Sequence, residues 1–150
     1  IASLITTSRL QVEAALDLAL ITQSWTWRGP VPANREVALR PFPVRSVDAV
    51  SLAPVDGAPA VLDGEAYTVC LDDRPSRVAF GAGVAGRVEI SFMAGFGDAA
   101  TDVPAPIRQA LLQLIAHWYE NREPVAIGDT ATRIPETVSA LLMPYREGRL

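Results

Sequence analysis

The stretch from Gly95 to Glu123, GFGDAATDVPAPIRQALLQLIAHWYENRE, decides the fold of this 150-residue chain. Asp102 stands where its carboxylate can accept hydrogen bonds from the free N–H groups of a first helical turn. Pro104 and Pro106 lie in or just before that turn, where a missing N–H costs little. Apolar residues then recur at helical spacing, namely Ile107, Leu111, Leu114, Ile115 and Trp118. The pattern predicts a central helix over 104–122 that packs against other elements.

Two more helices are predicted, one at each end of the chain. Residues 3–19 place Arg9 and Glu13 four apart, so that the two can pair on the wet face. The opposite face carries Leu4, Ser8, Val12, Ala15, Leu16 and Ala19. A last short helix is expected over 135–143, and Pro144 should stop or kink it. Its inner face comprises Val138, Leu141, Leu142 and Tyr145. Because the chain starts without Met and already in helical phase, we expect the natural protein to continue upstream.

Between the first and the central helix, residues 21–94 show the two-residue period of β-strands. The clearest run, 87–93, has Val88, Ile90 and Phe92 on one side and Glu89 and Ser91 on the other. In the run 44–55, strict alternation puts Val47 on the face opposite to Val50. Glycines and prolines separate the runs and mark turns rather than helices. We therefore predict a small antiparallel sheet in this region.

These elements predict an α+β fold. It consists of a small bundle of three or more helices with an antiparallel β-sheet inserted between the first and the central helix. A chain of this length is most simply one domain, so we expect a single domain over 1–150.

Composition narrows the classes of function. The net charge is −4, and the 13 basic residues are all Arg. Since binding along DNA requires clustered positive charge to replace counterions, an acidic domain is a poor general DNA binder. No stretch approaches the roughly 20 apolar residues that span a bilayer, so we expect no membrane association. Cys70 is the only cysteine, which excludes a disulfide within the chain and fits a small buried residue.

Residues for catalysis or metal binding are scarce. His117 is the only histidine, and neither it nor Cys70 has a second ligand of the same kind, which argues against a zinc site. Two acidic pairs are candidates for acid–base work, Asp72 with Asp73 and Glu120 with Glu123. Turn chemistry explains the first pair and a solvated helix end the second. We therefore expect no enzyme activity, no cofactor and no metal.

The segment Gly81-Ala82-Gly83-Val84-Ala85-Gly86 matches the spacing G-x-G-x-x-G of nucleotide-binding loops. That motif works only where a strand leads through it into a helix, whose N–H groups meet the phosphates. Here a strand-like run follows, so we reject nucleotide binding.

The tryptophans have two interpretations. Trp118 lies on the apolar stripe of the central helix and is expected in the core. Trp25 and Trp27 alternate with polar residues along one strand, and one of them is a candidate for a subunit contact, because indole rings often dominate interface energy.

Four motifs in this sequence belong together. A strand ends in the corner Phe92-Met93-Ala94-Gly95-Phe96-Gly97, and the helix entry Val103-Pro104-Ala105-Pro106-Ile107-Arg108 follows. The helix closes with Trp118-Tyr119-Glu120-Asn121-Arg122-Glu123. Later, Ile134-Pro135 leads into Leu141-Leu142-Met143-Pro144-Tyr145-Arg146. Over nearly its whole length the chain resembles the head–tail connector (adaptor) proteins of long-tailed bacteriophages and of alphaproteobacterial gene transfer agents. The motif residues are Gly95, Phe96, Gly97, Pro104, Ile107, Arg108, Trp118, Tyr119, Asn121 and Arg122.

The resemblance implies a structural role in a virion-like particle that is assembled in the bacterial cytoplasm. Such proteins form a ring, typically of twelve subunits, at the head–tail junction. The ring joins the portal protein to a stopper or tail-completion protein, and DNA passes through it without sequence-specific binding. A net-acidic wall suits that passage, since it does not grip phosphates.

Docking to neighbouring rings is expected at the ends and loops of the chain. The C-terminal Tyr145, Arg146, Arg149 and Leu150 are candidates for the portal contact. The loop 29–34 and the turn 72–75 are candidates for the contact with the next ring.

Two alternatives stay open at this point. The chain could be a tail-completion or stopper protein of the same particle, although those tend to be mainly β. It could also be a small hydrolase built on Asp72, Asp73, Glu120 or Glu123, which the presence of only one histidine and the lack of a clustered acid set disfavour.

Overall fold

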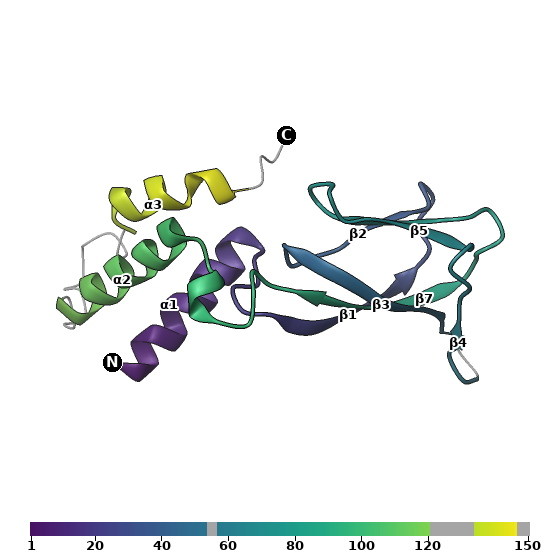
Figure 1. Ribbon diagram of the computed structural model, residues 1–150, viewed down its shortest axis with the longest axis horizontal. Helices are drawn as coiled ribbons and strands as arrows, with labels where there is room; N and C mark the ends of the chain where they lie inside the picture. Colours follow the sequence, from purple (N-terminus) through teal and green to yellow (C-terminus); the bar gives the residue numbers. More distant parts are fainter. Residues whose placement is uncertain (54–56, 121–133, 147–150) are drawn as a thin grey trace, which may run out of the picture. The chain divides into compact units, whose positions relative to one another are not determined.

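The computed structural model describes residues 1–53, 57–120 and 134–146, and its fold is α+β (Figure 1). The chain divides into two compact units. The helical unit consists of Ile1–Leu16 together with Ala99–Leu150, and the β unit consists of Asp17–Asp98. Along the chain, an N-terminal helix is followed by antiparallel sheets and then by two more helices. Within the described residues, three α-helices are present, as expected.

The helical unit contains α1 (Ala2–Leu16), α2 (Ala105–Glu120) and α3 (Glu136–Leu142), with α2 in contact with both other helices. The first helix ends at Leu16, three residues before the expected end of 3–19. The central helix begins at Ala105, one residue after the expected start of 104–122, and residues 121 and 122 lie outside the described residues. Each helix buries one stripe at helical spacing. The stripes consist of Ser8, Val12 and Leu16 on α1, Ile107, Ala110 and Leu114 on α2, and Val138 and Leu142 on α3. At Pro144 the α-helix gives way to a 3₁₀ turn, η2 (Met143–Tyr145), as expected.

The predicted role of Asp102 as the cap of the central helix is wrong. Asp102 ends a separate 3₁₀ turn, η1 (Ala100–Asp102), and its carboxylate accepts a 2.9 Å hydrogen bond from the N–H of Ala99. Val103 is extended because it precedes a proline, and this separates Asp102 from α2. The first turn of α2 uses the carbonyl of Pro104 instead, which accepts from the N–H groups of Ile107 and Arg108.

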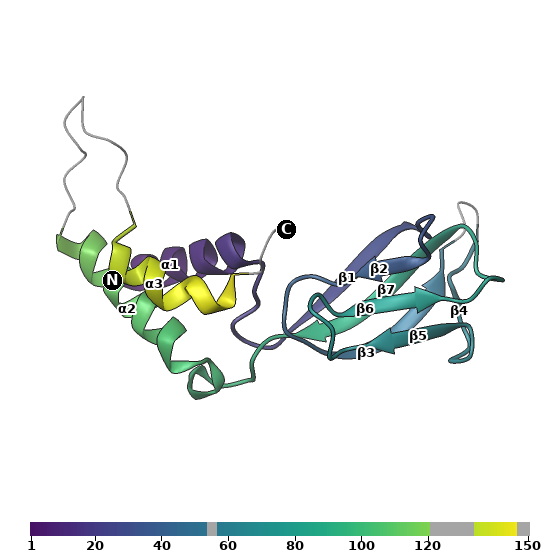
Figure 2. The same ribbon diagram turned by 90° about the horizontal axis from the view of Figure 1, so that it is seen from above.

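The β unit contains two antiparallel sheets rather than the single sheet that was predicted. The larger sheet has the order β1 (Gln23–Pro30), β7 (Arg87–Ala94), β3 (Val44–Leu52), β4 (Ala60–Val61). The smaller has the order β2 (Glu36–Ala38), β6 (Arg77–Phe80), β5 (Tyr67–Cys70). Figure 1 shows β2 and β5 of the smaller sheet in a layer apart from β1, β3 and β7 of the larger one. In Figure 2 the same strands are seen from above, so that the two sheets overlap. Alternation along a strand marks its buried face but not the sheet to which it belongs, which is why one sheet was inferred.

The core of the β unit is shared by the two sheets. The buried cluster draws on β3 and β7 of the larger sheet and on β2 and β6 of the smaller one. Val88, Ile90 and Phe92 all face this core, which confirms the alternation predicted for 87–93. In β3 the predicted alternation fails, because two register irregularities interrupt its pairing with β7. As a result Val47 and Val50 both face the core.

Arg35 holds two loops of the β unit together. Its backbone has φ 60°, which is uncommon for a residue with a side chain. Its guanidinium donates hydrogen bonds to the carbonyls of Phe80 (3.1 Å), Gly81 and Val84 (2.8 Å). These contacts fasten the loop after β1 to the turn between β6 and β7.

We expect Arg35→Ala to lower the free energy of unfolding by about 2 kcal/mol, because several charge-assisted hydrogen bonds to carbonyls are lost together. Urea denaturation followed by tryptophan fluorescence measures this change. Arg28→Ala is the control: it removes one exposed ion pair, so it should alter the denaturation midpoint much less. Equal midpoints for the two variants would contradict the role given to Arg35.

Candidate interaction surfaces

Trp25 and Trp27 lie on the core-facing side of β1, because their register partners on β7 are the buried Phe92 and Ile90. The two side chains nevertheless differ. Trp27 packs against the core with its ring over Gly29, where a Cβ atom would come within 2.6 Å of it. Trp25 is 40% exposed. Of the two tryptophans, Trp25 is therefore the one that is free to contact another molecule.

The aromatic–glycine corner at the end of β7 joins three parts of the β unit. Gly95 donates a hydrogen bond to the carbonyl of Pro43 (2.8 Å), and the N–H of Thr22 donates to Gly97 (2.9 Å). Phe96 donates to the carbonyl of Leu20 (3.3 Å). The glycine is required because its φ is 145° and a Cβ atom there would lie 2.5 Å from the backbone of Thr22. Gly95, Phe96 and Gly97 therefore stabilise the β unit through their backbone contacts.

The motif residues of α2 divide between core and surface. Ile107 is fully buried and Trp118 is half-buried, whereas Arg108 is exposed. Tyr119 is 48% exposed and lies seven residues after Leu112, which is 62% exposed, so both occupy the outward face of the helix. Asn121 and Arg122 lie outside the described residues. The outward face of α2 is therefore partly apolar.

The C-terminal candidates are only partly described. Tyr145 is half-buried at the end of η2, and Arg146 is exposed, with its backbone N–H donating to Met143. Arg149 and Leu150 lie outside the described residues.

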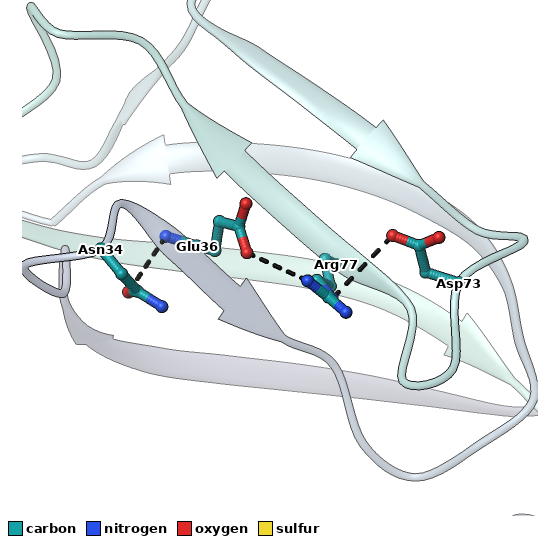
Figure 3. A network of polar contacts seen from close by, with 4 residues as sticks. All are labelled: Asn34, Glu36, Asp73 and Arg77. Atoms are coloured by element: carbon teal, nitrogen blue, oxygen red, sulfur yellow. Dashed lines mark hydrogen bonds and ion pairs between the residues drawn. The ribbon is translucent and has the colours of Figure 1, made fainter.

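The loop 29–34 and the turn 72–75 meet through one polar network on the smaller sheet (Figure 3). Arg77 contacts Glu36 at 3.2 Å and Asp73 at 3.9 Å, and the side-chain oxygen of Asn34 accepts from the N–H of Glu36. The guanidinium of the next turn residue, Arg74, lies 4.8 Å from the ring centroid of Phe42. The two predicted docking segments are thus tied to the same strands, β2 and β6.

The acidic candidates for catalysis do not converge within the described residues. Asp72 and Asp73 belong to the β unit, with Asp73 paired to Arg77, while Glu120 ends α2 in the helical unit. Glu123 lies outside the described residues. No group of three His, Cys, Asp or Glu side chains that could hold a metal ion occurs in the described part of the chain. Among the described residues, these carboxylates therefore form no cluster suited to hydrolysis.

The glycine-rich segment 81–86 connects β6 to β7, two strands, and so lacks the helix that a phosphate site of this type requires. Carbonyl oxygens of the turn accept hydrogen bonds from Arg35, so these groups already have a cationic partner. Elsewhere on the surface, Arg28 and Glu89 form a 2.6 Å ion pair across β1 and β7, and the hydrogen bond that Arg28 donates to the Glu89 carboxylate raises the pKa of Arg28. None of the described helices has the length and apolar character needed to cross a membrane.

Comparison with known protein families and with curated proteins finds no match. Solved structures do match over 99% of this chain. One match is a chain in the neck of an empty gene transfer agent (GTA) particle computed with C6 symmetry, with TM-score 0.80, 25% identity and 77% of that chain covered. A second belongs to the virion of a native GTA particle, with TM-score 0.78, 25% identity and 77% covered. A third comes from the neck of a native GTA particle computed with C12 symmetry, with TM-score 0.77, 26% identity and 82% covered. The chain is therefore structurally similar to a neck component of GTA particles.

Proposed function

We propose that this chain is a structural subunit in the neck of a GTA-like particle. The observation that carries the proposal is the similarity, over 99% of the chain, to a chain in GTA necks. The similarity includes both the helical and the β unit, so we treat the two units as one connector domain. The scattered acidic side chains of the described residues fit a protein that works through its contact surfaces.

Within the neck, we assign the chain the role of the adaptor, a ring subunit between the portal and the stopper or tail-completion protein. Three α-helices make up one of its two units, whereas a stopper is expected to be mainly β. In a cyclic ring of identical subunits, each subunit contacts its two neighbours through two different, complementary faces. The C12 and C6 symmetries used for the similar necks agree with a ring of twelve copies.

Electron microscopy of purified particles that carry this subunit with a small C-terminal label tests the proposal. We expect label density as a ring at the head–tail junction, directly under the portal. Density at the next ring toward the tail would instead assign the stopper role. Particles that lack the subunit would overturn the proposal as a whole.

DNA is proposed to pass through this ring without being held by it. The net charge of −4 is consistent with a wall that does not bind phosphates tightly. In this arrangement the arginines serve protein contacts, as Arg35 and Arg77 do inside the β unit.

For the contact with the portal, we propose the C-terminal segment that begins at Arg146. Deleting residues 146–150 is expected to produce particles whose heads lack tails, because the deletion removes a docking segment and leaves the helices in place. Negative-stain counting of heads with and without tails measures the effect. The exposed Arg87→Ala of the β unit is the control and should leave tails attached.

An unchanged thermal unfolding midpoint of the shortened chain would show that folding is not the cause of tail loss. Normally tailed particles that contain the shortened chain would contradict the docking role of this segment.

A further inference from the structure

The larger sheet of the β unit has two free edges, β1 and β4. Two large apolar side chains are exposed in the described part of this unit, and each lies on one of these edges. They are Trp25 on β1, at 40% exposure, and Val61 on β4, at 74%. An exposed edge with apolar side chains is a template for pairing with another strand.

The edge formed by β1 is long and regular. Its register with β7 is continuous from Gln23 to Pro30, and the N–H of Val31 donates to Gly86 in the same register. In an antiparallel pair, alternate residues bond to the neighbouring strand. Counting back in twos from Val31 gives the residues of β1 that hydrogen-bond to β7. Their side chains lie on the core-facing side of the sheet. Ser24, Thr26 and Arg28 therefore direct their N–H and C=O groups away from the sheet, and all three are exposed.

The edge formed by β4 has the same property at Val61. Leu62 donates a hydrogen bond to the carbonyl of Val50 at 2.8 Å, so the alternate residue Val61 directs its backbone groups away from β3. Val61 is paired in register with Ser51, while Ala60 is paired with Leu52, which packs against the core. The side chain of Val61 is therefore on the outer face of the sheet.

The two edges are compatible in face and in direction. The residues whose backbone groups point away from the sheet carry their side chains on its outer face. They are Ser24, Thr26 and Arg28 on β1 and Val61 on β4. A joint between them keeps the apolar face inside. Since the sheet has four antiparallel strands, β4 runs opposite to β1. Copies in one orientation, as in a ring, can thus join their sheets in antiparallel fashion.

We propose that β4 of one copy of this chain pairs with β1 of the next copy, so that the larger sheet continues around the ring. This inference rests on the proposed neck function, which supplies the ring. In the joint, Val61 exchanges backbone hydrogen bonds with one of Ser24, Thr26 or Arg28. Trp25 is opposite Ala60 of the neighbour in the Ser24 register and opposite Leu62 in the Thr26 register. The joint is short, because β4 has two residues and Pro59 has no N–H to donate. Its main effect is to set the angle between subunits.

Disulfide trapping in purified particles tests this joint. In a Cys70→Ser background, Val61→Cys is combined in turn with Ser24→Cys, Thr26→Cys and Arg28→Cys. The two edges of one copy are three strand spacings apart, about 14 Å, which is too far for a disulfide within one chain. After mild oxidation we expect at least one pair to give a ladder of covalent multimers on a non-reducing gel.

Two controls make the trapping specific. Val61→Cys combined with Gln23→Cys, whose side chain is on the other face, should give no ladder. Thr26→Pro removes an N–H that points out of the sheet, so the chain should fold but enter particles at least tenfold less often, whereas Thr26→Val should enter normally.

The outcomes separate the joint from the neck function. Particles that contain the cysteine variants but give no ladder, or normal entry of folded Thr26→Pro, would overturn the joint and leave the neck function standing. Absence of the Cys70→Ser parent from the neck would overturn both.

Discussion

Replacing Gly95 by alanine is expected to lower the free energy of unfolding by about 3 kcal/mol or more, because strain in the backbone adds to a clash. Gly95 has φ 145°, a conformation that side-chain-bearing residues rarely adopt. An added Cβ atom would lie 2.5 Å from both the Cα and the N of Thr22, and backbone atoms cannot rotate away as a side chain can. The corner that connects β7 to residues 20–22 would have to open.

Urea denaturation followed by the fluorescence of Trp25 and Trp27 measures this loss. Gly83→Ala is the matched control, since no atom lies within 4 Å of its added Cβ and its φ is not positive. That change should stay within about 0.5 kcal/mol of the parent. Similar stabilities for the two alanine variants would contradict the steric role of Gly95. With Gly95→Ala we also expect loss of the chain from particles.

Ile107→Ala is expected to destabilise the chain by about 3 kcal/mol, because it leaves a cavity in a packed core. Ile107 is fully buried and is the first residue of the buried stripe of α2. The loss combines the transfer free energy of the deleted methyl groups with the contacts that the surrounding side chains no longer make.

Leu112→Ala on the same helix is the control for this prediction. Leu112 is 62% exposed, so its truncation should change the free energy of unfolding by no more than about 0.5 kcal/mol. Helical circular dichroism during urea denaturation compares the two variants. An equal loss from both positions would mean that α2 does not bury the face that contains Ile107.

The helices could be predicted from sequence because their signals are local. The apolar spacing in 104–122 predicts a buried stripe without any information about partner elements. In the structure, α2 buries Ile107 and Leu114 from that stripe. Pro144 ends α3 through its own geometry. The alternation of 87–93 was as clear, because β7 is central in its sheet and one of its faces is entirely buried.

Features that depend on partners could not be predicted in this way. Strict alternation in β3 failed at its irregular pairing with β7, and Asp102 found its partner in Ala99 rather than in the helix that follows. Trp25 and Trp27 have the same pattern in sequence, yet the first is exposed and the second covers Gly29. No sequence pattern predicted that Arg35 donates hydrogen bonds to carbonyls more than 40 residues away.

By itself the sequence determined the α+β class, the three helices, the strand faces of β7 and the resemblance that led to the GTA neck. Hydrophobic periodicity and turn residues depend on only a few neighbouring positions, so they can be recognised in a single sequence. Only the tertiary structure decided that the strands form two sheets, and that β1 and β4 are the free edges of the larger one. Strand pairing is a long-range choice set by packing and register, and alternation along each strand is the same for every possible neighbour.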